Sequence, residues 1–222
     1  MSPSTEPAIS HYLEQIAARV EQSIQTLGLS SVPVPDAFST ATGEIAGTPV
    51  KMESFRYTGN AFDTYTVAYL RNPAQGLLSV TVSGIPRAES GLPILGLDYV
   101  GFRGALSLVA LDLCPVHETY WASHCEAFLK DLYEHAQQLV QRKVPGFTQG
   151  VFSASAIFAA ATNSHQCQQS THLAERLLSH AESLFLAANE CALDAEQIER
   201  NREQIQQWKR AMRTNKKEHS AL

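Results

Sequence analysis

The chain has 222 residues, of which 44% are hydrophobic and 18% are charged, and its formal net charge is −5 at pH 7. This length suits one large domain or two small ones, and the apolar fraction supports a folded core, which excludes a disordered chain and a coiled-coil rod. The negative charge argues against a protein built to bind nucleic acid or an anionic membrane. Residues 199–222 differ from the rest, because they carry seven Lys or Arg against three Glu. This basic end is either a solvated helix face or a surface for an acidic partner.

The cysteines give no sign of a metal or redox motif. Cys114, Cys125, Cys167 and Cys191 lack the close spacing of such motifs. The chain begins with a polar stretch, residues 1–6, and contains no apolar run long enough to span a membrane. We therefore expect reduced thiols, a cytoplasmic protein, no membrane association and no bound metal.

In chain order, the sequence predicts a helix, a run of strands and then more helices. Apolar residues at three- and four-residue steps predict a helix over 10–27, followed by an extended crossing at 31–38 and a loop at 39–47. Alternating or β-branched segments predict strands at 49–57, 62–71, 77–85, 91–100 and 105–115. Helical spacing returns at 118–143, 170–191 and 194–212, whereas 151–162 fits either a strand or a buried helical turn. Short turns between consecutive strands indicate an antiparallel sheet, so the fold class is α+β.

One carboxylate stands out, because Asp98 lies inside the apolar run 91–100. An ionised carboxylate in an apolar sheet costs several kcal/mol unless it is paired or protonated. Asp98 is therefore either a structural exception or a proton donor. Asp112 lies at the end of the next predicted strand, where a carboxylate often caps the following turn. The chain contains no GxSxG, P-loop, GxGxxG or HExxH motif that would point to other chemistry.

Two apolar blocks resemble the ferredoxin-dependent bilin reductase family. Residues 91–98, GLPILGLD, are similar to the family's block of Leu-Pro, two hydrophobic residues, Gly, any residue and Asp, and residues 111–115, LDLCP, are similar to its second block. Residues 32–38 and, more weakly, 204–222 are similar to further family segments. The resemblance implies a single domain over 1–222 with a three-layer α/β/α sandwich around a central antiparallel sheet. It also implies that a bilin binds between the sheet and the C-terminal helices.

By the same resemblance, the protein reduces biliverdin IXα, or a dihydrobiliverdin, to a phycobilin without a bound metal or flavin. Reduced ferredoxin supplies single electrons, and the protein supplies protons to radical intermediates. Asp98 matches the central family aspartate and is the expected catalytic proton donor. A carboxyl with a pKa raised by burial suits that role near neutral pH.

The chain departs from the family pattern around this aspartate. Thr81 occupies a position where some members have His or Asn, and Ala68 or Tyr69 a position where some have Glu. Asn215 or Lys216 stands where many members have a second Asp, so a two-electron reduction is the expected reaction. The expected substrate contacts are Thr81, Ser83, Asn215 and Lys216, and the expected contacts to ferredoxin or to bilin propionates are Lys209, Arg210, Arg213 and Lys217.

Three alternatives stay open at this point. The first is a non-catalytic bilin-binding or carrier protein on the same fold, favoured by the missing second acid. The second is a reductase of another linear tetrapyrrole, such as a chlorophyll catabolite. The third is an unrelated α+β protein in which the GLPILGLD block is only part of the core.

Overall fold

A computed structural model describes residues 9–35, 39–45, 48–72, 76–146, 150–187 and 193–219, with only the backbone for residues 41, 45, 48 and 214–219. Within these residues, nine strands form a single sheet in which all neighbours are antiparallel. The strand order is β1-β3-β4-β5-β6-β7-β9-β8, and β2 pairs with β3 beside β1. The predicted antiparallel sheet and α+β class are confirmed.

The central strands follow the predicted meander. β3 (Thr48–Thr58), β4 (Phe62–Asn72), β5 (Leu77–Pro86), β6 (Ile94–Phe102) and β7 (Ala105–Cys114) pair in sequence. A short 3-10 turn, η2 (Ala88–Ser90), joins β5 to β6. Alternating side chains in these strands face opposite sides of the sheet, so each strand contributes to two different surfaces.

The sequence does not predict two of the strands, β2 and β8. β2 (Thr40–Ile45) lies where a loop is expected, and β8 (Val140–Gln141) lies within the predicted helix 118–143. β2 is held by main-chain pairing to β3, while Thr42, Gly43 and Glu44 are exposed, so no apolar pattern marks it. The predicted helix ends at Ala136, where the Gln141 Nε2 amide donates to the Ala136 carbonyl at 2.6 Å.

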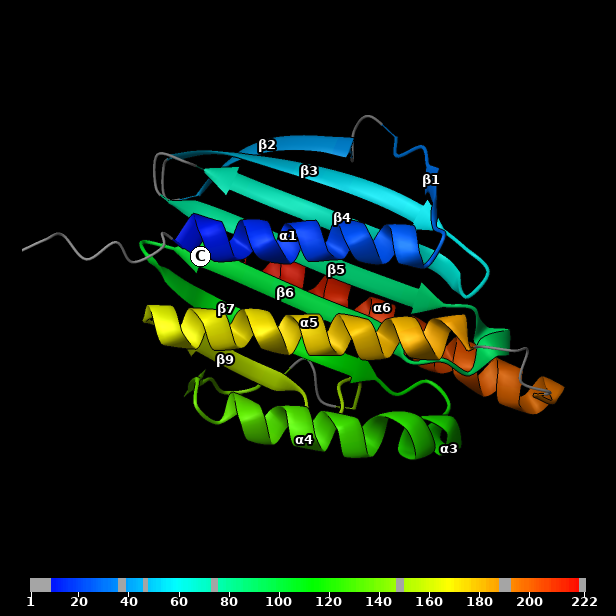
Figure 1. Cartoon of the computed structure of the whole chain (residues 1–222). Helices are drawn as coiled ribbons and strands as arrows, with labels where there is room; N and C mark the ends of the chain where they lie inside the picture. The colour runs from blue at the N-terminus through cyan, green and yellow to red at the C-terminus, as the bar shows by residue number, and fades with distance from the viewer. Residues whose placement is uncertain are drawn as a thin grey trace, which may run out of the picture.

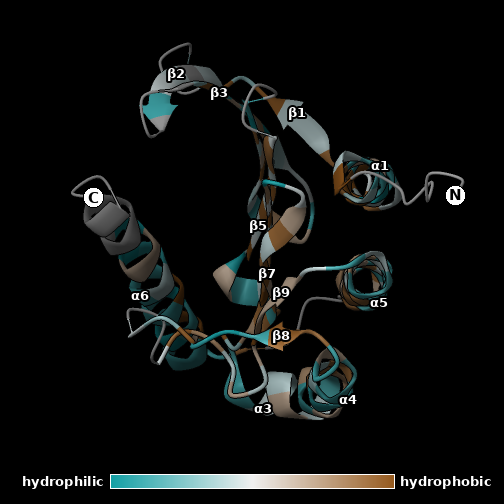
Figure 2. Cartoon of the chain, turned by 90° about the vertical axis from the view of Figure 1, so that its left-hand side faces the viewer, coloured by the Kyte–Doolittle hydropathy of each residue, from teal (hydrophilic) through white to brown (hydrophobic). Residues whose placement is uncertain are grey.

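The remaining elements complete three layers (Figure 2). α1 (Ile9–Thr26), α4 (Ala127–Ala136) and α5 (Ser164–Leu186) cover one face, whereas α6 (Ala195–His219) is the one long helix among the described elements that lies on the other. A single helical turn, α3 (Glu118–Trp121), and a π-helical turn, η3 (Ala122–Glu126), lead into α4. β1 (Ser30–Val32) is at one end of the sheet, and β9 (Ile157–Ala161) pairs with β7 and β8 near the other. The expected three-layer sandwich is confirmed, and segment 151–162 contains a strand rather than a helical turn.

The two C-terminal helices lie on opposite faces of the sheet, so they do not form one layer (Figures 1 and 2). α5 packs against α1, with Arg19 donating two hydrogen bonds to the Glu182 carboxylate at 2.6 and 3.0 Å. The buried Tyr99 hydroxyl of β6 donates to the Ser170 carbonyl of α5 at 2.6 Å. Because α5 packs into the core, the binding site expected between the sheet and the C-terminal helices can involve only α6.

Candidate active site on the α6 face of the sheet

Alternation along β6 directs Asp98 toward α6. Leu95, Leu97 and Tyr99 are buried in the large core formed with α1 and α5. Ile94 belongs to a smaller core with residues of α6. Asp98 has the same parity as Ile94, so its carboxyl lies on the α6 face and outside the main core.

The residues beside Asp98 have small side chains. In the strand register, Asp98 is opposite Thr81 of β5 and Ala110 of β7, and the same row continues to Ala68 of β4 and Ser54 of β3. All five are partly exposed. We call this row of five residues the Asp98 row. The row forms a floor of small, partly exposed side chains, in which Asp98 is the only ionisable residue.

The Asp98 carboxyl is desolvated but is hydrogen-bonded only lightly. The Thr81 hydroxyl donates to Asp98 Oδ1 at 2.8 Å. Burial raises the pKa of Asp98 to about 6, and the Thr81 hydrogen bond opposes the rise by favouring the ionised form. No charged neighbour contributes to this shift. The group can therefore hold and release a proton near neutral pH.

Asp112 lies on the same face but is used differently. Its side chain is 1% exposed and accepts two hydrogen bonds from Ser153, one from the backbone N–H at 2.8 Å and one from the hydroxyl at 2.5 Å. Burial raises the pKa of Asp112, while these bonds lower it. The sequence predicts Asp112 as a cap for the next turn, and the adjacent Leu113 and Cys114 do form hydrogen bonds with it, but its main donor is Ser153, 41 residues further along the chain. Asp112 fixes the segment after residue 150 against the sheet.

α6 covers one end of this face and leaves the Asp98 row accessible. Ile205 and Trp208 of α6 are buried against Ile85, Ile94 and Cys114 at the ends of β5, β6 and β7. The Asn201 amide adds a buried hydrogen bond to the Ala88 carbonyl at 2.8 Å. The helix is therefore anchored beside the floor, and the partly exposed residues of the Asp98 row lie next to it.

The predicted contact residues on β5 and on the last turns of α6 form two groups. Thr81 contacts Asp98, and Ser83 lies on the same face of β5, opposite Gly96. Asn215, Lys216 and Lys217 belong to the last turns of α6, but their side chains lie outside the described part of the chain. The structure thus brings together two of the predicted residues and Asp98.

The basic residues of α6 are partly neutralised. Lys209 Nζ lies 3.7 Å from the Asp63 carboxylate of β4, and Arg200 pairs with Glu196 at 3.1 Å. Arg210 Nε donates to the Gln206 carbonyl at 3.4 Å, and Arg213 is exposed. Of the basic residues named here, Lys209 and Arg200 thus have acidic partners.

Sequence reasoning missed Ala110 and Ser54 of the Asp98 row and the partner of Asp112. Ala110 and Ser54 are ordinary strand residues, and only the register shows that they flank Asp98. The alternation of small residues with apolar ones in the predicted strands is the signal that could have found them. Nothing in the sequence near Ser153 indicates that it contacts a residue of β7.

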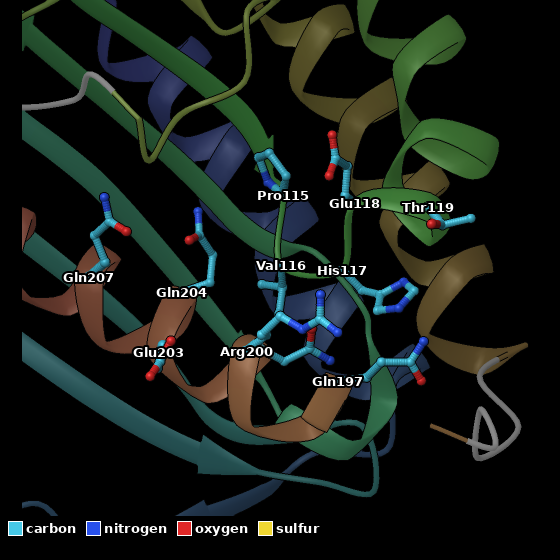
Figure 3. Close-up of a pocket in the computed structure, with 11 residues that line it drawn as sticks. Pro115, Val116, His117, Glu118, Thr119, Gln197, Arg200, Glu203, Gln204 and Gln207 are labelled. Carbon is cyan, nitrogen blue, oxygen red and sulfur yellow. The ribbon is translucent and has the colours of Figure 1, made fainter. Parts of the chain in front are cut away.

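A separate hollow of about 590 Å³ lies on the other flank of α6. Figure 3 shows it between the connection from β7 to α3 and the α6 residues Gln197, Arg200 and Gln204. The lining is mainly polar and contains none of the predicted site residues. This hollow is distinct from the Asp98 row.

The described residues offer neither a metal site nor a membrane-spanning helix. No group of three or more His, Cys, Asp or Glu among them is arranged to hold a metal ion. None of their helices combines the length and apolar character needed to cross a membrane.

The chain thus forms an antiparallel α/β/α sandwich with a half-buried carboxyl on the α6 face, and comparison with known proteins identifies the family. The model of the ferredoxin-dependent bilin reductases matches residues 16–220, so the chain belongs to this family. The fold is similar to the crystal structure of selenomethionine phytochromobilin synthase from tomato in complex with biliverdin, with a TM-score of 0.72 and 17% sequence identity. This similarity covers 87% of the present chain and 69% of the tomato chain. No curated protein sequence matches.

Proposed function

We propose that this single-domain protein is a ferredoxin-dependent reductase of biliverdin IXα, or of a dihydrobiliverdin, that forms a phycobilin. The observation that carries the proposal is the Asp98 carboxyl, which has a pKa raised to about 6 and lies on a floor of small side chains beside α6. Family membership supports the electron donor and the class of substrate. A flat conjugated ligand suits such a floor, because small side chains allow close approach over a wide area.

Asp98 supplies protons to the reduced substrate. Each electron added to a conjugated tetrapyrrole increases its basicity, so a nearby acid stabilises the product of that step. The reduction of one carbon–carbon double bond consumes two electrons from two ferredoxin molecules and two protons. Asp98 donates a proton, becomes a carboxylate held by Thr81, and regains a proton from solvent before the next electron arrives. The partial exposure of Asp98 in the free protein supports this exchange.

The remaining predicted residues have binding roles in this proposal. Thr81 in the Asp98 row and Ser83 beside it on the same face of β5 contact the substrate, and so do Asn215 and Lys216 from the last turns of α6. Other basic residues of α6 bind the propionates or acidic ferredoxin, namely Lys209, Arg210, Arg213 and Lys217. Lys209 also lies 3.7 Å from the exposed Asp63 carboxylate, which competes for its charge.

A non-catalytic bilin carrier is the second candidate function. The neighbours of Asp98 along its row, Thr81 and Ala110, are not ionisable. Asp112 is the other carboxyl on this face near Asp98, and its hydrogen bonds to Ser153 hold it in the core. A single exchangeable acid gives the substrate only one nearby source of protons, which favours a carrier over a reductase. Binding of biliverdin without turnover would support the carrier.

The test is an anaerobic assay with biliverdin, ferredoxin, ferredoxin reductase and NADPH, followed by absorbance. The expected result is conversion of the bound biliverdin spectrum to that of a reduced bilin, with Asp98→Asn retaining binding and losing turnover. Asp131→Asn is the matched control, since Asp131 is exposed and pairs with Arg176 on the opposite side of the sheet. A spectrum that changes on binding and then stays constant would refute the reductase and leave the carrier. Full turnover by Asp98→Asn would remove Asp98 from the mechanism.

A further inference from the structure

Gly96 lies in the interior of β6, where glycine is unfavourable and its presence requires an explanation. A strand-interior glycine weakens a sheet, because it loses more backbone freedom on folding and packs no side chain. In other strands, such a residue often marks a left-handed backbone or a close approach of another group. Gly96 has no positive φ, so the first reason is absent.

Two other strand glycines show what a packing requirement looks like. A Cβ at Gly84 would lie 2.8 Å from Phe62 Cε1, and a Cβ at Gly101 would lie 2.6 Å from Leu13 Cδ1. Both face the helical layer and leave no room for a methyl group. A Cβ at Gly96 would meet only the Asp112 carbonyl oxygen, at 3.9 Å, which is an ordinary contact. The packing of the free protein therefore does not require glycine at position 96.

The position of Gly96 beside Asp98 explains why glycine is present there. It has the parity of Asp98, lies two residues before it and is partly exposed on the α6 face. Its strand neighbours are Ser83 on β5 and Asp112 on β7. The absent side chain leaves a notch in the floor, bordered by these two residues and adjacent to the Asp98 carboxyl.

We propose that Gly96 is a substrate-positioning residue, whose bare backbone lets one ring of the tetrapyrrole lie flat against β6 so that a reacting atom comes within reach of Asp98. The inference rests on the proposed bilin binding and adds the point at which the substrate is closest to the sheet. A side chain at position 96 would hold the ring away from the floor. A misplacement of about 1 Å in an active site can lower the rate about 100-fold.

The test compares Gly96→Ala and Gly96→Val with the wild-type protein in three measurements. The thermal midpoint should stay unchanged or rise in both variants, since side chains with higher strand propensity replace glycine in open space. The dissociation constant for biliverdin should increase about 10-fold or more for Gly96→Val and less for Gly96→Ala. The anaerobic turnover rate of bound biliverdin should fall in the same order.

Gly43→Ala is the matched control. Gly43 is also a strand glycine without positive φ, and a Cβ there would meet only Val50 Cγ2 at 3.9 Å. It lies on β2, which pairs with β3 at the edge of the sheet, so its substitution should leave binding and turnover unchanged.

Each outcome decides one question. A stable Gly96→Val variant that binds and reduces biliverdin like the wild-type protein overturns the positioning role and leaves the proposed function intact. A Gly96→Ala variant that loses stability also overturns it, because the glycine would then serve packing. A wild-type protein that fails to bind biliverdin refutes the proposed function itself, and the positioning role with it.

Discussion

Replacing Asp98 by Asn tests the electrostatic basis of the site without any substrate. Asn can still accept the Thr81 hydrogen bond, but it has no charge to desolvate. The pKa of Asp98 rises from 3.8 to about 6 in the folded protein. At 1.36 kcal/mol for each pH unit, burial would disfavour the ionised form by about 3 kcal/mol. Partial exposure of Asp98 reduces this figure through solvent screening, to about 1–2 kcal/mol.

The direction of the pH dependence follows from proton binding. Between about pH 4 and pH 6, the folded protein holds a proton on Asp98 that the unfolded chain has lost, so stability falls as pH rises. Below pH 3.8, both states are protonated and the desolvation cost disappears. The free energy of unfolding of Asp98→Asn, relative to that of the wild-type protein, should therefore increase by about 1–2 kcal/mol as the pH rises from 4 to 7.

Urea unfolding at a series of pH values measures this difference. The fluorescence of Trp121 and Trp208, which are partly buried and buried, reports unfolding. Asp131→Asn should show a small dependence of the opposite sign, because Arg176 lowers the pKa of exposed Asp131. A difference between Asp98→Asn and the wild-type protein that stays constant from pH 4 to pH 8 would show that Asp98 is not desolvated.

Three further substitutions probe the site and its support. Thr81→Val should raise the pKa of Asp98 further and move the alkaline limb of the pH–rate profile up by about one pH unit; an unmoved limb would contradict this role of the hydroxyl. Gly101→Ala should lower the free energy of unfolding by about 1–3 kcal/mol, because its Cβ would overlap α1, and a wild-type thermal midpoint would count against the packing argument. Ser153→Ala should cost about 1–3 kcal/mol in urea unfolding, since it removes a hydrogen bond from the buried Asp112; a neutral result would mean that the carboxyl has other support.

The central sheet could be predicted because its strands carry their own signals. β4 to β7 combine alternating side chains with short turns, and the helices α1 and α6 show regular apolar spacing. β2 and β8 could not be predicted in this way, because main-chain pairing rather than side-chain burial holds them. β9 is buried on both faces, so its sequence shows no alternation to distinguish it from a buried helix.

The site was predictable only in part. The apolar surroundings of Asp98 marked it as unusual, and the resemblance to a family gave it a role. The partnership of Asp98 with Thr81 depends on the register of two strands 17 residues apart. The positions of α5 and α6 on opposite faces of the sheet are not specified by any local pattern in the sequence. For these reasons, the composition of the floor appeared only with the structure.

The two faces of the sheet are covered unequally, so alternate residues of β6 have different roles. Leu95, Leu97 and Tyr99 hold the sheet to the three-helix layer, whereas Gly96 and Asp98 face the single helix α6. Substitutions at the second set therefore leave the main core intact. A mutational scan along β6 should show a two-residue period, with loss of folding at one set of positions and changed reactivity at the other.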